Sequence, residues 1–195
     1  IDKTLSFYEK KIILFPGRLT SWKGHEMFIE SLNIFKQKNP DKLFYAIILG
    51  SDQGRKIYKK KIQRLVEQYR LINDVIFIEN CKNMPLAYKI SDIVVSCSIE
   101  PEAFGRVAVE AQAMEKAIVA SNIGGSKETI IDNKTGFLFK AGDTMSLSDK
   151  LSHVFELDET TLKSMGNEGR KNVINKFNVE KMCFSTYSEY KKLIS

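Results

Sequence analysis

The residues best suited to chemistry begin with a glycine and two cations near the start of the sequence. Gly17 is followed by Arg18 and, five positions later, by Lys23. Gly17 lets the backbone turn tightly, and both cations can reach a diphosphate that lies over the N-terminus of a following helix. Two surface cations at a turn would give the same pattern, so this segment alone leaves both interpretations open.

A pair of glutamates forms a second candidate site. Glu102 and Glu110 are eight positions apart, with Gly105 between them at the expected start of a helix. A loop carboxylate and a helix carboxylate at this spacing can face one crevice, although acids near a helix start also simply complement the helix dipole. A third segment, residues 122–128, offers free backbone N–H groups around two glycines and can either bind phosphate or only form a turn.

All three segments follow strands of one expected sheet. Short β-rich runs alternate with helical stretches up to about residue 140, a pattern typical of an α/β fold with a parallel sheet and helices on both faces. Ligands of such Rossmann-like sheets bind beyond the carboxyl ends of the strands, where the strand order reverses. We expect six strands, then a helical end at 144–195; the strands lie at 12–15, 44–49, 75–78, 93–96, 117–120 and 137–139.

Helical periodicity places amphipathic helices at 26–38 and 57–69, both packed on the sheet. The helical end divides into helices at 144–155, 159–175 and 179–194. The last of these carries an apolar stripe, which suits either packing on its own domain or packing across an interdomain seam.

Composition describes an ordinary globular chain. With 195 residues, 43% hydrophobic and 28% charged, one domain spanning 1–195 can bury a proper core. No apolar run approaches the ~20 residues of a membrane span, and no signal-peptide pattern is present. The three cysteines, Cys81, Cys97 and Cys183, are widely spaced and fit reduced packing thiols, which favours a cytoplasmic location.

The net charge of +6 concentrates in the basic run at 55–64. Its cations alternate with apolar positions in a helical rhythm, which favours a solvated helix face over a binding patch. His25 and His153 fit packing or surface positions better than catalysis. No His, Cys or Asp cluster has metal-ligand spacing.

In the joint order of these segments, the sequence resembles the retaining glycosyltransferases of family 4, the group 1 type. These enzymes have two facing Rossmann-like domains. The resemblance covers essentially the whole chain as the C-terminal domain, one half of a glycosyltransferase B-type fold. The E-x-F-G-x4-E-A frame is its most specific part. The matching blocks are GRLTSWKG at 17–24, IILGSDQG at 47–54, ISDIVVSCS at 90–98, EPEAFGRVAVEAQAM at 100–114, SNIGGSKETIIDNKTGFLF at 121–139 and KFNVEKM at 176–182.

The resemblance implies a role for each matched position in the reacting centre. Arg18 and Lys23 correspond to the pair that neutralises the donor diphosphate as the nucleotide leaves. Glu102 corresponds to the carboxylate that orients the donor sugar, together with the backbone N–H groups of Phe104 and Gly105.

Further positions are implied to hold the nucleotide. Glu110 corresponds to the acid that accepts hydrogen bonds from the ribose hydroxyls, and Gly17 and Val107 line the donor pocket. Asn80 and Cys81 are implied to flank the base. The family usually has a glycine after the third strand, where this chain has Glu79-Asn80, so the choice of nucleotide stays open. It also usually has Gly-x-Pro where this chain has 115–117, a departure that is expected to alter a turn without removing a ligand.

The implied function is retaining, hexosyltransferase-like transfer from a UDP-, GDP- or ADP-linked sugar to a saccharide or lipid-linked acceptor. Bacterial polysaccharide or lipopolysaccharide biosynthesis is the implied context, with a protein that is cytoplasmic or peripheral at the inner face of the membrane. The expected partners are the nucleotide sugar, a missing N-terminal acceptor domain to which residues 1–11 would be a linker, and a membrane-associated acceptor lipid. No metal, cofactor or nucleic acid is expected, and the chain alone is expected to be inactive.

Two alternatives remain open at this stage. A sugar-nucleotide epimerase of the same architecture would also bind a nucleotide sugar, although the E-x-F-G frame favours transfer. A non-catalytic module that binds nucleotides or an anionic surface would also suit the basic charge.

Overall fold

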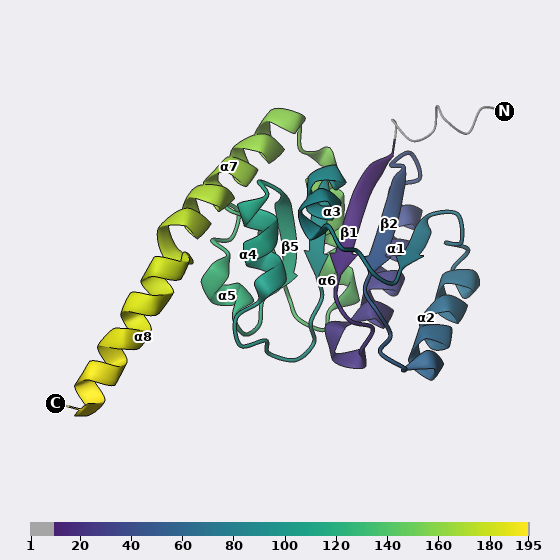
Figure 1. Cartoon of the computed structure of the whole chain (residues 1–195). Helices are drawn as coiled ribbons and strands as arrows, with labels where there is room; N and C mark the ends of the chain where they lie inside the picture. The colour runs from purple at the N-terminus through teal and green to yellow at the C-terminus, as the bar shows by residue number, and fades with distance from the viewer. Residues whose placement is uncertain (1–9, 195) are drawn as a thin grey trace.

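The sheet has six parallel strands in the order β3-β2-β1-β4-β5-β6 (Figure 1). The computed structural model describes residues 10–194 of the chain. All six expected strands are confirmed, with ends that differ by at most one residue. They are β1 (Lys11–Pro16), β2 (Phe44–Leu49), β3 (Val75–Ile78), β4 (Ile93–Ser96), β5 (Ala117–Ser121) and β6 (Phe137–Phe139).

The start of the first strand corrects one expected boundary. Lys11 is already part of β1 and pairs with Phe44 of β2, so the expected linker at 1–11 cannot extend to its last residue. Residues 1–9 of that linker lie outside the described part of the chain.

Helices cover both faces of the sheet, as expected (Figure 1). Neighbouring residues of a strand point to opposite faces, so each face carries its own apolar cluster. On β1, Ile13 and Phe15 join the larger apolar cluster, whereas Leu14 joins the smaller one on the other face. The larger cluster packs under α1 (His25–Lys38), α2 (Lys56–Gln68) and α6 (Thr144–Glu156), and the smaller under α3 (Met84–Ile90) and α4 (Arg106–Ala113).

Helix α3 is one of the short elements that the periodicity did not predict. It has only seven residues, and Pro85 lies in its first turn, where the missing N–H group costs nothing. Asn83 caps the helix, since its side chain accepts a hydrogen bond from the Leu86 backbone N–H. Seven residues are too few to show a helical period, so this short helix is recognised only from its caps.

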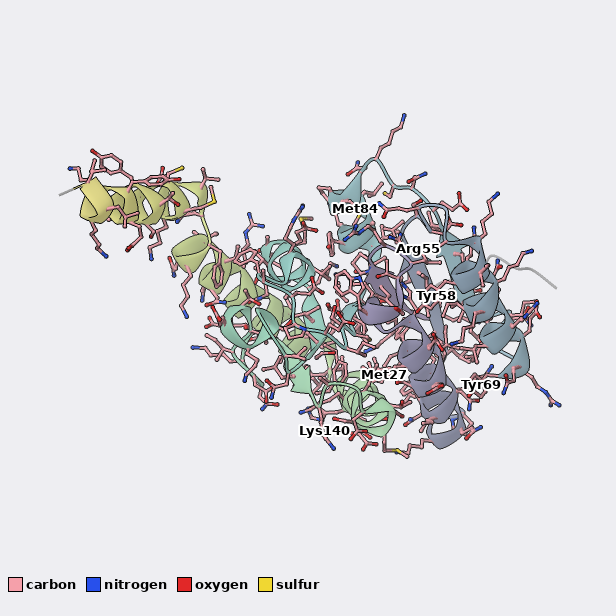
Figure 2. All side chains as sticks on the ribbon, turned by 90° about the horizontal axis from the view of Figure 1, so that it is seen from below. Met27, Arg55, Tyr58, Tyr69, Met84 and Lys140 are labelled. Carbon is pink, nitrogen blue, oxygen red and sulfur yellow. The ribbon has the colours of Figure 1, made fainter. Side chains whose placement is uncertain are left out.

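The helical end of the chain is confirmed, but its last helix does not pack on the domain. Helix α7 (Glu159–Lys176) lies against α4, whereas α8 (Val179–Ile194) projects away from the body and has no buried residue (Figures 1 and 2). Of the two packings that the sequence left open for its apolar stripe, packing on its own domain is therefore not found. Cys183 on α8 is exposed and is no packing thiol, while Cys97 is buried. Across residues 10–194, no helix is both long and apolar enough to span a bilayer.

Candidate functional site

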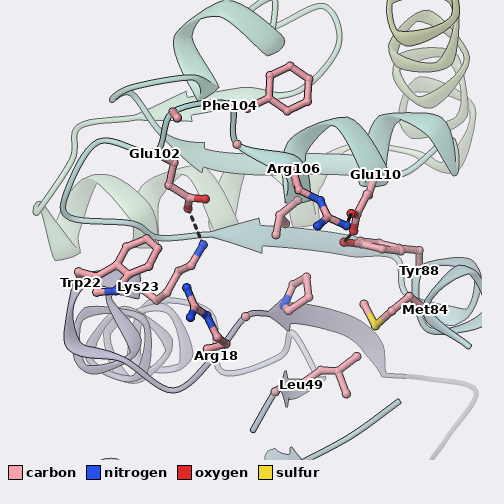
Figure 3. A pocket seen from close by; sticks show the side chains of 16 residues that line it. Arg18, Trp22, Lys23, Leu49, Met84, Tyr88, Glu102, Phe104, Arg106 and Glu110 are labelled. Atoms are coloured by element: carbon pink, nitrogen blue, oxygen red, sulfur yellow. Dashed lines mark hydrogen bonds and ion pairs between the residues drawn. The ribbon is translucent and has the colours of Figure 1, made fainter. Parts of the chain in front are cut away.

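A cleft of about 570 Å³ opens beyond the carboxyl ends of the strands, where the strand order reverses between β1 and β4. Connections from β1 lead to β2 on one side and from β4 to β5 on the other, which leaves a crevice between their loops. The loops after β1, β2 and β4 line it, together with residues of α3 and α4 (Figure 3).

The cleft gathers most of the predicted site. Eight of the ten predicted residues line it, namely Gly17, Arg18, Lys23, Glu102, Phe104, Gly105, Val107 and Glu110. The other two, Asn80 and Cys81, follow β3 and are not among the lining residues. Helix α3 instead contributes Met84 and Tyr88, which the sequence did not single out.

A close approach of two loops positions the first cation. The Gly17 N–H donates to the Leu49 carbonyl at 2.9 Å, and a Cβ on Gly50 would lie only 1.9 Å from the Gly17 carbonyl oxygen. Position 50 therefore admits only glycine, and the two loops stay in contact. Arg18 is exposed beside this contact and lines the cleft, free to meet an anion there (Figure 3).

The second cation already has a partner across the cleft. Lys23 ends a short 3-10 helix (Ser21–Lys23), and its Nζ lies 2.7 Å from Oε1 of Glu102. Both side chains are largely buried, with 11% and 17% of their surface exposed. Lys23 also lies over the Trp22 ring, and the Ser98 hydroxyl donates to the same carboxylate oxygen. The ion pair thus joins the β1 side of the cleft to the β4 side.

Glu110 is held from two sides. The Tyr88 hydroxyl donates to Oε2 at 2.7 Å, and Arg106 donates to Oε1 at 2.9 Å from one helical turn earlier (Figure 3). Tyr88 is 2% exposed, and its burial, with the Glu110 carboxylate beside it, raises the pKa of the hydroxyl well above its ordinary value. Tyr88 therefore stays a proton donor at neutral pH. The Arg106–Glu110 spacing was readable from the sequence, whereas the contact with Tyr88 was not.

The start of α4 offers a binding feature of its own. Gly105 takes a left-handed conformation, with φ of 73°, immediately before Arg106, and no side chain caps the helix. Uncapped N–H groups and the positive end of the helix dipole favour an anion at this position. The cleft is lined by Gly105, Arg106 and Val107. This helix end therefore attracts an anion to the same cleft as Arg18 and Lys23.

The third candidate segment supports the cleft from behind. The Gly125 N–H donates to the Glu102 carbonyl at 2.8 Å, and a Cβ on Gly124 would lie 2.6 Å from that same oxygen. None of residues 122–128 lines the cleft. Of the two interpretations left open by the sequence, the structure supports a turn, here one that holds the Glu102 loop.

Within residues 10–194, the acidic, histidine and cysteine side chains do not form a metal site. No three His, Cys, Asp or Glu side chains there converge on a common point that could hold a metal ion. The chemistry available to the cleft comes from three cations, Arg18, Lys23 and Arg106, together with a helix N-terminus and two carboxylates. This combination suits a ligand that carries both a diphosphate and hydroxyl groups.

Comparison with known proteins gives the same picture. Residues 1–172 match the family described as glycosyl transferases group 1. The D-inositol 3-phosphate glycosyltransferase of Paenarthrobacter aurescens (strain TC1) is 30% identical over 185 residues, which cover 94% of this chain and 44% of that protein. The chain thus spans about half the length of this curated relative.

Solved structures share the fold. A glycosyltransferase from Rickettsia africae ESF-5 superposes with a TM-score of 0.89 at 34% identity, over 99% of this chain and 51% of that one. Anabaena HepE in complex with UDP-glucose gives 0.86 at 25% identity, over 97% and 51%. The C-terminal domain of the group 1 family protein LpcC from Francisella tularensis gives 0.77 at 28% identity, over 90% and 91%.

These matches confirm the expected architecture, a Rossmann-like sheet that corresponds to one half of a two-domain glycosyltransferase B-type fold. The family match covers most of the sequence and includes every segment that lines the cleft. The chain therefore belongs to the glycosyl transferases group 1 family.

Proposed function

We propose that the cleft between β1 and β4 binds a nucleotide-diphosphate sugar, as the donor half of a retaining glycosyltransferase. The observation that carries this proposal is the meeting of two cations and two glutamates in one cleft at the switch point of the sheet. The HepE structure, which was solved with UDP-glucose, supports a UDP-linked sugar as the first donor to test.

The diphosphate would lie between the β1 loop and the start of α4. Arg18 is exposed and available to it, and the N–H groups at the start of α4 face the same cleft. Lys23 would share its charge between the diphosphate and Glu102, its partner in this structure. Cations fixed at this position stabilise the negative charge that develops as the nucleotide leaves.

The two carboxylates would then serve different parts of the donor. Glu102 follows β4 and lies beside Lys23, so a sugar attached to the diphosphate would reach it first. Glu110 lies one turn along α4, beside Tyr88, where it suits the ribose hydroxyls. Asn80 and Cys81 stay predicted contacts of the base.

Transfer itself is proposed to require a second half. Holding the acceptor hydroxyl beside the donor carbon in a closed site accounts for roughly 7–11 kcal/mol of barrier lowering. The described cleft supplies one wall only, and the relatives are about twice as long. We expect residues 1–195 to bind the donor without a metal and without transferring the sugar to the saccharide or lipid-linked acceptor.

Isothermal titration calorimetry tests the donor site. UDP, GDP, ADP and UDP-glucose are titrated into the wild-type chain and into an Arg18→Ala/Lys23→Ala variant. Each lost charge-assisted contact is worth about 1.5–3 kcal/mol, so the double variant should bind at least about a hundredfold more weakly. A matched Lys134→Ala/Lys140→Ala variant removes the same charge from exposed positions outside the cleft and should bind normally. Equal affinity of wild type and the cleft variant would refute the phosphate site.

The carboxylates are tested with the same titrations. Glu110→Ala should weaken UDP and UDP-glucose alike, whereas Glu102→Ala should keep UDP binding and remove the contribution of the sugar. Loss of plain UDP binding in folded Glu102→Ala would contradict the assignment.

Donor turnover is then assayed with saccharide and lipid-linked acceptors, for the chain alone and with the N-terminal half of a group 1 glycosyltransferase added. Efficient transfer by the chain alone would contradict the need for a second half.

A further inference from the structure

We propose that Tyr88 is a positioning residue, which holds Glu110 toward the ribose hydroxyls of a bound nucleotide and thereby favours ribonucleotides over nucleotides that lack these hydroxyls. The inference rests on the proposed function. It is carried by the 2.7 Å hydrogen bond from the Tyr88 hydroxyl to Oε2 of Glu110, in the wall of the cleft (Figure 3).

Tyr88 is itself fixed by its surroundings. Its helix is capped at the start by Asn83, and at the end the Ser91 hydroxyl donates to the Tyr88 carbonyl at 2.8 Å. The ring is buried in the smaller apolar cluster, which includes Leu14, Leu49, Val94, Ala108 and Ile118. A close-packed ring with a capped backbone leaves the hydroxyl little freedom, so it marks one fixed point for the carboxylate.

The two oxygens of Glu110 have partners of different kinds. Oε2 accepts from the buried Tyr88 hydroxyl, whereas Oε1 accepts from Arg106, whose side chain is 83% exposed. Exposed pairs one helical turn apart are weak and exchange readily with solvent. A ribose hydroxyl can therefore replace Arg106 at Oε1 while Tyr88 keeps the carboxylate in place.

Without the Tyr88 hydroxyl, Glu110 would have to be ordered by the nucleotide itself. Immobilising one such side chain costs an amount that corresponds to about threefold to tenfold in affinity. The loss should appear only with a ligand that contacts Glu110. A general loosening of the cleft would instead weaken every nucleotide.

The experiment compares UDP with 2′,3′-dideoxy-UDP by calorimetry. Tyr88→Phe keeps the ring and should bind UDP about threefold to tenfold more weakly while binding dideoxy-UDP as the wild type does. In a Glu110→Ala background, Tyr88→Phe should have no further effect. Tyr58→Phe is the matched control, because Tyr58 also has a buried hydroxyl but lies outside this cleft, and it should leave both affinities unchanged.

The outcomes separate this inference from the proposed function. Normal UDP binding by Tyr88→Phe, with weakened binding by Glu110→Ala, would overturn the role of Tyr88 and leave the donor site intact. Equal weakening of UDP and dideoxy-UDP would show a merely structural role and would also overturn it. Failure of the wild type to bind any nucleotide would refute the proposed function itself.

A second measurement does not depend on how Tyr88→Phe folds. With 3-fluorotyrosine placed at position 88, the fluorine resonance should shift when UDP is added and stay in place when dideoxy-UDP binds. An identical response to both ligands would contradict the contact through Glu110.

Discussion

The ion pair between Lys23 and Glu102 should stabilise the fold as well as serve the cleft. We consider Lys23→Met, Glu102→Gln and the two together. Exposed ion pairs contribute about 0.2–1 kcal/mol, whereas removal of one partner of a fully buried pair costs about 3–5 kcal/mol. The pair lies between these limits, because its side chains are 11% and 17% exposed and Ser98 still donates to Glu102 when Lys23 is lost.

Each single substitution should therefore cost about 2 kcal/mol, and the coupling energy between them should be about 1–2 kcal/mol. Urea unfolding at pH 7 measures both values. With a slope of about 2 kcal/mol per molar urea, each single variant should lower the midpoint by about 1 M. The coupling should persist in 1 M salt, since buried charges are screened less than exposed ones.

An exposed pair provides the control for this cycle. Lys38 and Asp149 lie 2.6 Å apart, but their side chains are 42% and 60% exposed. Lys38→Met and Asp149→Asn should couple by less than about 0.5 kcal/mol and lose that coupling in salt. If the coupling energy between the Lys23 and Glu102 substitutions were as small as that of the exposed pair, the interpretation of the Lys23–Glu102 pair as a stabilising link across the cleft would be refuted.

Two further predictions concern stability. Burial lowers the pKa of His25 from 6.5 to about 4, so between these values the folded state binds fewer protons than the unfolded state. His25 should therefore contribute about 3 kcal/mol to the free energy of unfolding above pH 6.5, and this contribution should be lost as the pH falls toward 4. We expect the free energy of unfolding, measured with urea from pH 7 to 4.5, to fall less steeply in His25→Phe than in the wild type, whereas the control His153→Gln, at an exposed position, should fall as the wild type does. An unchanged pH dependence in His25→Phe would contradict the role of buried His25. Gly124→Ala should destabilise by about 1–3 kcal/mol more than Gly142→Ala, because both have positive φ but only the first new Cβ meets backbone, that of Glu102. Equal midpoints in thermal unfolding would count against that contact.

The sheet was predictable because its signal is local. Each strand is a short run of β-branched and aromatic residues, such as 44–49 and 93–96, bounded by polar or glycine-containing segments. Alternation with helical periods then fixes a parallel sheet. Loops after parallel strands meet at one edge, which is why Arg18, Lys23 and Glu102 could be placed together before their contacts were known.

What the sequence missed depends on packing between distant segments. No helix was predicted around Tyr88, and its contact with Glu110 spans 22 positions. The Gly124-Gly125 turn looks like an anion site, and only the approach of the Glu102 loop shows that it supports backbone instead. Asn80 and Cys81 were assigned to the base by likeness alone, and they stay predicted contacts.

Helix α8 has a consequence for hydrogen exchange. No residue of Val179–Ile194 is buried, so its backbone hydrogen bonds are protected by the helix alone. Isolated helices of about this length are marginal in water, because nucleation is unfavourable and no tertiary contact offsets it. Its amide hydrogens should therefore exchange far faster than those of α1, whose apolar face is buried. A slowing of exchange confined to α8 would then report directly that another surface has covered this helix.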